Sequence, residues 1–107
     1  MTYRVLVTAL AEADLRGIFT HIAAADGPAQ AETVLARLEA AVLSLKSLPA
    51  RGNHPPELER LGVRAYREIH AAPWRILYQI QGREVHVYCV LDARRDVQSQ
   101  LAERLLR

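Results

Sequence analysis

Apolar side chains in the first half of the chain recur with the spacing of amphipathic helices. Alternation over residues 2–8 predicts a short strand, and Thr8 is a suitable cap for a helix over about 9–25. One face of that helix gathers the apolar side chains, namely Ala11, Leu15, Ile18, Phe19 and Ile22. Asp26-Gly27-Pro28 then predicts a break, because glycine suits the end of one helix and proline suits the first turn of the next.

A second helix is predicted over about 28–47. Its apolar stripe consists of Ala31, Leu35, Leu38, Val42 and Leu45. Because the connection to the first helix is tight, the two helices are expected to form an antiparallel hairpin. Their combined apolar stripes need another surface to cover.

Residues 48–62 contain three prolines and two glycines, which predicts a loop. One helical turn is expected within it, at 56–60. Few compact domains contain a loop of this length, and such loops often have a function.

Three strands are predicted after the loop, over 63–69, 74–80 and 84–91. The connection Gln81-Gly82-Arg83 is short and offers a glycine for positive φ, so the last two strands should form a hairpin. Short connections make all three strands antiparallel neighbours. Asp96 is expected to cap a terminal helix, whose inward side chains would be Val97, Leu101, Leu105 and Leu106.

The predicted order of elements is therefore β-α-α-β-β-β-α, which is an α+β fold. The N-terminal helical hairpin would pack on one face of an antiparallel sheet. The other face would stay open and carry Arg67 and Arg75 towards a larger partner. The length of 107 residues fits one domain, 1–107.

Charge is distributed unevenly, although the formal net charge is only +2. Residues 1–50 hold four basic and five acidic residues, whereas 51–107 hold ten arginines and seven acidic residues. Of the 14 basic residues, 13 are arginine, which binds phosphate and carboxylate groups in a bidentate manner. This favours a polyanionic partner for the second half. The alternative is that the arginines reflect a GC-rich genome.

The single cysteine, Cys89, lies in an apolar run and is expected to be a buried free thiol, as suits a reducing cytoplasm. No stretch has the apolar character of a signal peptide or a membrane span. A soluble, cytoplasmic protein is therefore expected.

Several local strings, taken in order, resemble the RelE/ParE superfamily of type II toxins. They are Leu48-Pro49-x-Arg51-Gly52, Tyr66-Arg67-Glu68-Ile69, Pro73-Trp74-Arg75-Ile76-x-Tyr78, Val90-Leu91-Asp92 and Arg94-Arg95-Asp96. The resemblance covers nearly the whole chain, with Trp74 where the family usually has tyrosine. It implies a growth-inhibiting toxin that forms a hetero-oligomer with a cognate antitoxin.

The resemblance also implies one of two activities. ParE-like members poison DNA gyrase and are not nucleases, whereas RelE-like members cut messenger RNA on the ribosome. The RelE-like pattern has a tyrosine where this chain has Leu101, and lysines where this chain has none, since Lys46 is its only lysine. These departures favour the ParE-like activity, with the metal-independent endoribonuclease as the alternative.

If the chain is a nuclease, its arginines would stabilise the phosphorane charge and other groups would move protons. The candidate catalytic residues are Arg67, Arg75, Arg95, Glu68 and His70. His54 and Glu57 in the loop are further candidates. The competing interpretation is that Arg75 simply pairs with Glu68.

An antitoxin segment is expected to pack across the helical hairpin and the sheet edge. The candidate contacts are Leu15, Phe19, Leu35 and Leu38, each of which could instead belong to the core. The chain has one cysteine and no His-x-x-x-His pair on a helix, so no metal site is expected. No cofactor is expected either.

Overall fold

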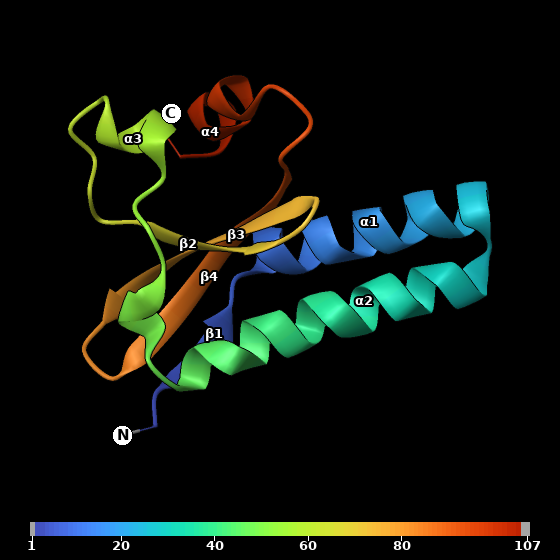
Figure 1. Ribbon diagram of the computed structural model, residues 1–107, viewed down its shortest axis with the longest axis horizontal. Coiled ribbons are helices and arrows are strands. Elements are labelled where there is room, and N and C mark those ends of the chain that lie inside the picture. The colour runs from blue at the N-terminus through green and yellow to red at the C-terminus, as the bar shows by residue number, and fades with distance from the viewer. Residues whose placement is uncertain (1, 106–107) are drawn as a thin grey trace.

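The computed structural model describes residues 2–105 and consists of a four-stranded sheet between two groups of helices (Figure 1). The elements in chain order are β1 (Arg4–Val7), α1 (Ala9–Asp26), α2 (Pro28–Leu43), α3 (Pro56–Glu59), β2 (Arg67–Ala71), β3 (Trp74–Gln81), β4 (Glu84–Asp92) and α4 (Val97–Leu105). The α+β class and the order of elements are as predicted. Within the described residues, no helix is long and apolar enough to cross a membrane.

The helical hairpin begins and ends at the residues that the sequence indicates. The hydroxyl of Thr8 accepts a hydrogen bond from the amide of Ala11 at 3.2 Å and caps α1. Gly27 ends α1 with φ of 96°, a value that favours glycine, and Pro28 opens α2. Figure 1 shows the two helices side by side, extending beyond the sheet at the hairpin turn.

The sheet has the strand order β1-β4-β3-β2. Strand β1 runs parallel to β4, and the other neighbouring strands are antiparallel. Gly82, with φ of 62°, turns the chain between β3 and β4, as predicted. A bulge at Leu77 and Tyr78 shifts the register of β3 against β4.

Each face of the sheet has its own apolar core. The hairpin covers one face, where the buried residues are Ala11, Leu38, Val42, Leu45, Trp74, Ile76, Tyr78, Val85, Val87 and Val90. Helices α3 and α4 lie together against the opposite face (Figure 1), where the buried residues are Leu58, Leu77, Cys89, Leu91, Val97 and Leu101. The expectation of an open second face was therefore wrong for the part under α3 and α4.

Two predicted boundaries were also wrong. The strand predicted over 63–69 begins at Arg67, because the amide of Val63 bonds to the carbonyl of Leu58 and closes the turn after α3. The helix predicted over 28–47 ends at Leu43 and continues as a 3-10 turn over Ser44–Lys46. The guanidinium of Arg51 donates to the carbonyls of Ser44 and Ser47 at this end, where side chains commonly satisfy the backbone carbonyls of a helix.

The terminal helix agrees with its predicted pattern. Asp96 accepts hydrogen bonds from the amide and the hydroxyl of Ser99, so it caps α4 as expected. Val97 and Leu101 are buried and Leu105 packs against them. Leu106, also predicted to point inward, lies outside the described residues.

Candidate functional site

Arg75 of β3 lies in a network of ion pairs beneath α3. Its Nε donates to Glu68 Oε1 at 2.6 Å, and its two terminal nitrogens donate to the carboxylate of Glu57 at 3.0 and 2.7 Å. The Arg75 side chain is 11% exposed and that of Glu68 is 1% exposed. Every nitrogen of the guanidinium is therefore occupied by a carboxylate of the same chain.

Further contacts complete this network. Glu68 Oε2 accepts from the amide group of Asn53 at 2.8 Å and lies 3.4 Å from Nε2 of the exposed His70. The Arg75 guanidinium holds the pKa of Glu57 below its usual range, so this carboxylate stays charged near neutral pH. Among the described residues, no buried side-chain nitrogen or oxygen lacks a hydrogen-bond partner. The competing interpretation of Arg75, as the partner of Glu68, is the one that the geometry fits.

Arg67 does not accompany Arg75, although both were expected on one open face. Arg67 is opposite Tyr78 in the β2–β3 register, whereas Glu68 is opposite Leu77, so Arg67 points to the face that the hairpin covers. Its guanidinium donates to the carbonyls of Ala50 and Gly52, at 3.1 and 2.8 Å. Arg67 therefore fastens the loop before β2, and the expectation of a shared face was wrong.

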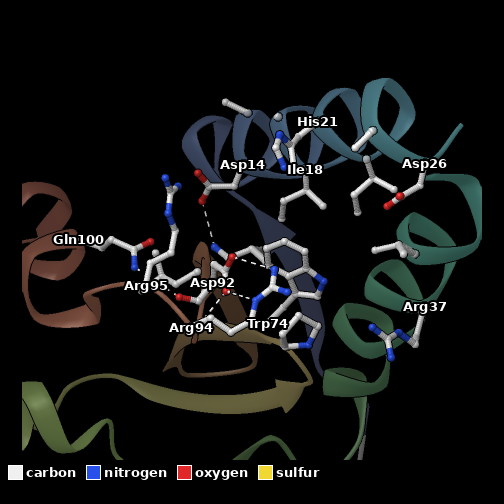
Figure 2. Close-up of a pocket in the computed structure, with 18 of the residues that line it drawn as sticks. Asp14, Ile18, His21, Asp26, Arg37, Trp74, Asp92, Arg94, Arg95 and Gln100 are labelled. Atoms are coloured by element: carbon white, nitrogen blue, oxygen red, sulfur yellow. Dashed lines mark hydrogen bonds and ion pairs between the residues drawn. The ribbon is translucent and has the colours of Figure 1, made fainter. Parts of the chain in front are cut away.

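Arg95 lies in a third place, on the turn between β4 and α4. It lines a cleft of about 840 Å³ between that turn and the hairpin, and neither Arg67 nor Arg75 is among the described residues that line it. Figure 2 shows Trp74 in the centre of this cleft, below Ile18 of α1. The three arginines proposed for a nuclease site thus do not converge on one point.

The same turn carries a second arginine, Arg94, which forms an ion pair. Arg94 donates from Nε and Nη2 to the two oxygens of Asp92, each at 3.0 Å, and its guanidinium lies 5.9 Å from the ring centre of Trp74. This pairing lowers the pKa of Asp92. Both groups therefore remain charged and paired at neutral pH.

Asp14 of α1 is an organising residue that the sequence interpretation missed. Its carboxylate accepts from the amide of Val90 at 2.9 Å and from the guanidinium of Arg104 at 2.8 Å. It thus joins the hairpin to β4 and to α4. Its position between Ala11 and Ile18 on the apolar stripe was a detectable signal, because a carboxylate on a buried face needs a partner.

The outer side of the hairpin carries a shallow groove of about 500 Å³, which is mainly apolar. Its lining includes three of the four predicted antitoxin contacts, and the full set is Glu12, Leu15, Arg16, Phe19, Thr20, Leu35 and Glu39. The fourth contact, Leu38, is 0% exposed and belongs to the core under the hairpin. The prediction of Leu38 as an antitoxin contact was therefore wrong, and the alternative that it belongs to the core is correct.

The remaining acid–base candidates also have structural partners. His54 lies with Nδ1 3.1 Å from the carbonyl oxygen of Tyr66, as expected of a turn residue. Within residues 2–105, no group of three or more His, Cys, Asp or Glu side chains is arranged to hold a metal ion. The chain thus has a groove and a cleft at its surface. The contacts of Arg75 with Glu57 and of Arg104 with Asp14 and Tyr88 hold α3 and α4 on the rest of the fold.

Comparisons with known proteins agree with this description. The curated protein Toxin ParE3 of Caulobacter vibrioides is 29% identical over 101 residues, which cover 94% of this chain and 97% of the relative. The chromosomal ParDE toxin–antitoxin system from P. aeruginosa contains a chain of similar fold, with a TM-score of 0.71 at 20% identity over 85% of this chain and 96% of that one. The toxin–antitoxin complex RelBE2 from Mycobacterium tuberculosis gives a TM-score of 0.61 at 21% identity, covering 86% and 92%.

A family model described as the ParE toxin of the type II toxin–antitoxin system parDE matches residues 5–97. The matched segment includes the hairpin, the sheet except for Arg4, and the first residue of α4. The chain therefore belongs to the ParE toxin family of type II toxin–antitoxin systems.

Proposed function

We propose that this ParE-family toxin acts by binding DNA gyrase, without cutting nucleic acid itself, and that a cognate antitoxin neutralises it. Membership of the ParE toxin family supports the gyrase target, because the resemblance to ParE-like toxins implies an inhibitor of that enzyme. The two similar solved structures are both toxin–antitoxin systems, which supports an antitoxin partner.

The non-catalytic part of the proposal rests on one observation, that the Arg75 guanidinium is already bonded to two carboxylates of its own chain. A phosphate that took the bidentate position on this guanidinium would have to displace carboxylates of the chain itself. The displaced carboxylates would then lose their cationic partner, and leaving a buried charge without its partner costs about 3–5 kcal/mol. Arg67 and Arg95 lie elsewhere, so the phosphorane charge of an RNA-cleavage reaction would meet no free arginine cluster beside Glu68 and His70.

The groove on the hairpin is the surface that we assign to the antitoxin. Leu15 and Phe19 of α1 and Leu35 of α2 line it, together with the charged side chains of Glu12, Arg16 and Glu39. An amphipathic antitoxin helix would bury these apolar side chains and pair its own charged residues with the charged side chains of the groove. This is the usual way for a helix to bind in a groove.

A supercoiling assay with purified gyrase tests the proposal. We expect micromolar toxin to inhibit the supercoiling of relaxed plasmid, and we expect equimolar antitoxin to restore it. Arg16→Glu, on the rim of the groove, should leave gyrase inhibition unchanged and weaken reversal by the antitoxin. Full supercoiling at all toxin concentrations would exclude gyrase as the target.

A further inference from the structure

Leu48 combines two unfavourable features. Its side chain is 78% exposed, the highest value among the exposed large apolar residues that the structure describes. Its backbone has φ of 49° and ψ of 51°, the left-handed conformation that favours glycine or asparagine. The leucine side chain offers no hydrogen bond to offset this conformation and, being exposed, adds little to the apolar core.

The turn that carries Leu48, residues 47–52, is held from several sides. The guanidinium of Arg51 donates to the carbonyls of Ser44, Ser47 and Leu48, and to the hydroxyl of Ser44 at 2.6 Å. These four hydrogen bonds fold the turn back onto the end of α2. The strained backbone is therefore fixed by its surroundings.

The other end of the same turn is attached to the sheet. The hydroxyl of Tyr78 donates to the carbonyl of the buried Pro49, and Arg67 donates to the carbonyls of Ala50 and Gly52. A Cβ at Gly52 would collide with the Tyr78 hydroxyl, so the backbone packs directly against the sheet there. Strained residues that are held in this way cluster at functional positions.

The charge around the turn is positive. No acidic residue occurs between Glu39 and Glu57, whereas Lys46 and Arg51 are exposed on either side of Leu48. The next acidic residues along the chain are all paired: Glu57 and Glu68 bond to Arg75, and Glu59 bonds to Arg64. The turn thus presents an apolar side chain between two exposed basic residues, with no acidic residue nearby in the sequence.

We propose that Leu48 is a preorganised anchor by which the toxin binds its cellular target, entering an apolar pocket that carboxylates surround on the target protein. This inference rests on the proposed function in so far as the target is a protein. A rigid apolar anchor loses little conformational freedom on binding, and such anchors dominate the affinity of many interfaces. Leu48 is absent from the lining of the hairpin groove, so the anchor and the antitoxin contact are separate surfaces.

The variant Leu48→Asn tests the proposal, because asparagine tolerates the left-handed conformation and removes the apolar side chain. We expect the thermal unfolding midpoint to stay the same or rise. We expect growth inhibition to weaken, so that at least ten times more colonies survive induction than with the wild type. Leu48→Met should retain inhibition. The matched control is Leu61→Asn, which replaces a leucine that is 55% exposed outside the turn and should inhibit growth like the wild type.

Three outcomes would overturn the anchor. These are full growth inhibition by Leu48→Asn, an equal loss in Leu61→Asn, and a more than tenfold loss of antitoxin affinity in Leu48→Asn. Growth inhibition does not presuppose gyrase. If Leu48→Asn loses inhibition while the wild type leaves gyrase active, the proposed target is wrong and the anchor stands.

Discussion

The guanidinium of Arg75 and the carboxylate of Glu57 form a bidentate pair, with nitrogen–oxygen distances of 2.7 and 3.0 Å. This pair joins α3, a single helical turn within a long loop, to the third strand of the sheet. Because Glu68 occupies the remaining Nε of Arg75, the three side chains act as a brace between the loop and the sheet.

Removing one carboxylate from this brace should destabilise the fold strongly. We expect Glu68→Ala to lower the free energy of unfolding by about 3 kcal/mol, because it leaves the Arg75 charge poorly compensated in a buried place. Urea unfolding followed by circular dichroism measures this change. Glu84→Ala is the control, since its contacts with Arg4 and His86 are partly exposed and should together contribute about 1 kcal/mol or less. Equal effects of the two variants would contradict the brace.

Stability should depend on pH through Glu57. Its pKa is lowered in the folded state, mainly by the hydrogen bond from Arg75, so its contribution is fully present above the ordinary value of 4.5. That contribution is lost as the pH falls through the lowered folded-state pKa. We therefore expect Glu57→Gln to be less stable than the wild type at pH 7 and the difference to shrink towards pH 3. A difference that does not change with pH would show that the Glu57 charge is unimportant.

Substitutions on the two sides of the hairpin should have different effects, on stability at the buried side and on antitoxin binding at the groove. Leu38 is fully buried, so Leu38→Ala should lower the free energy of unfolding by about 3 kcal/mol. Phe19 is half-buried in the outer groove, so Phe19→Glu should affect stability less and should weaken antitoxin binding at least tenfold. Calorimetric titration with the antitoxin and urea unfolding measure the two effects. If Phe19→Glu leaves antitoxin binding unchanged, the groove is not the antitoxin-binding site.

The thiol of Cys89 should be unreactive in the native protein. Burial raises its pKa to about 12, so little thiolate forms at neutral pH. We expect labelling with a thiol reagent such as iodoacetamide to be at least a hundredfold slower than in urea-unfolded protein at pH 8. Rapid labelling of the folded protein would show that the core beneath α4 opens readily.

The parts of the fold that local chemistry determines could be predicted from the sequence. Thr8, Gly27 and Gly82 mark boundaries because each boundary needs a cap or a positive φ at that position. In β3, Trp74 and Ile76 lie on one face and Arg75 on the other, as the alternation of a strand requires.

Contacts between distant segments could not be predicted in the same way. Glu57 lies in a proline-rich loop without periodicity, so nothing in the sequence indicated that α3 would cover Arg75. The face of Arg67 depends on the register of β2, which begins later than the apolar pattern suggests. Leu35 and Leu38 are three residues apart on the same apolar stripe of α2. Only the packing of the hairpin on the sheet determines that Leu38 is in the core and Leu35 lines the groove.

The central claim is that this toxin acts by binding and not by cutting RNA. Its most direct test measures two activities over the same toxin concentrations: plasmid supercoiling by purified gyrase, and messenger RNA cleavage on translating ribosomes, mapped by primer extension. The account predicts that supercoiling falls while the messenger RNA stays intact. Cleaved messenger RNA together with full supercoiling would contradict it.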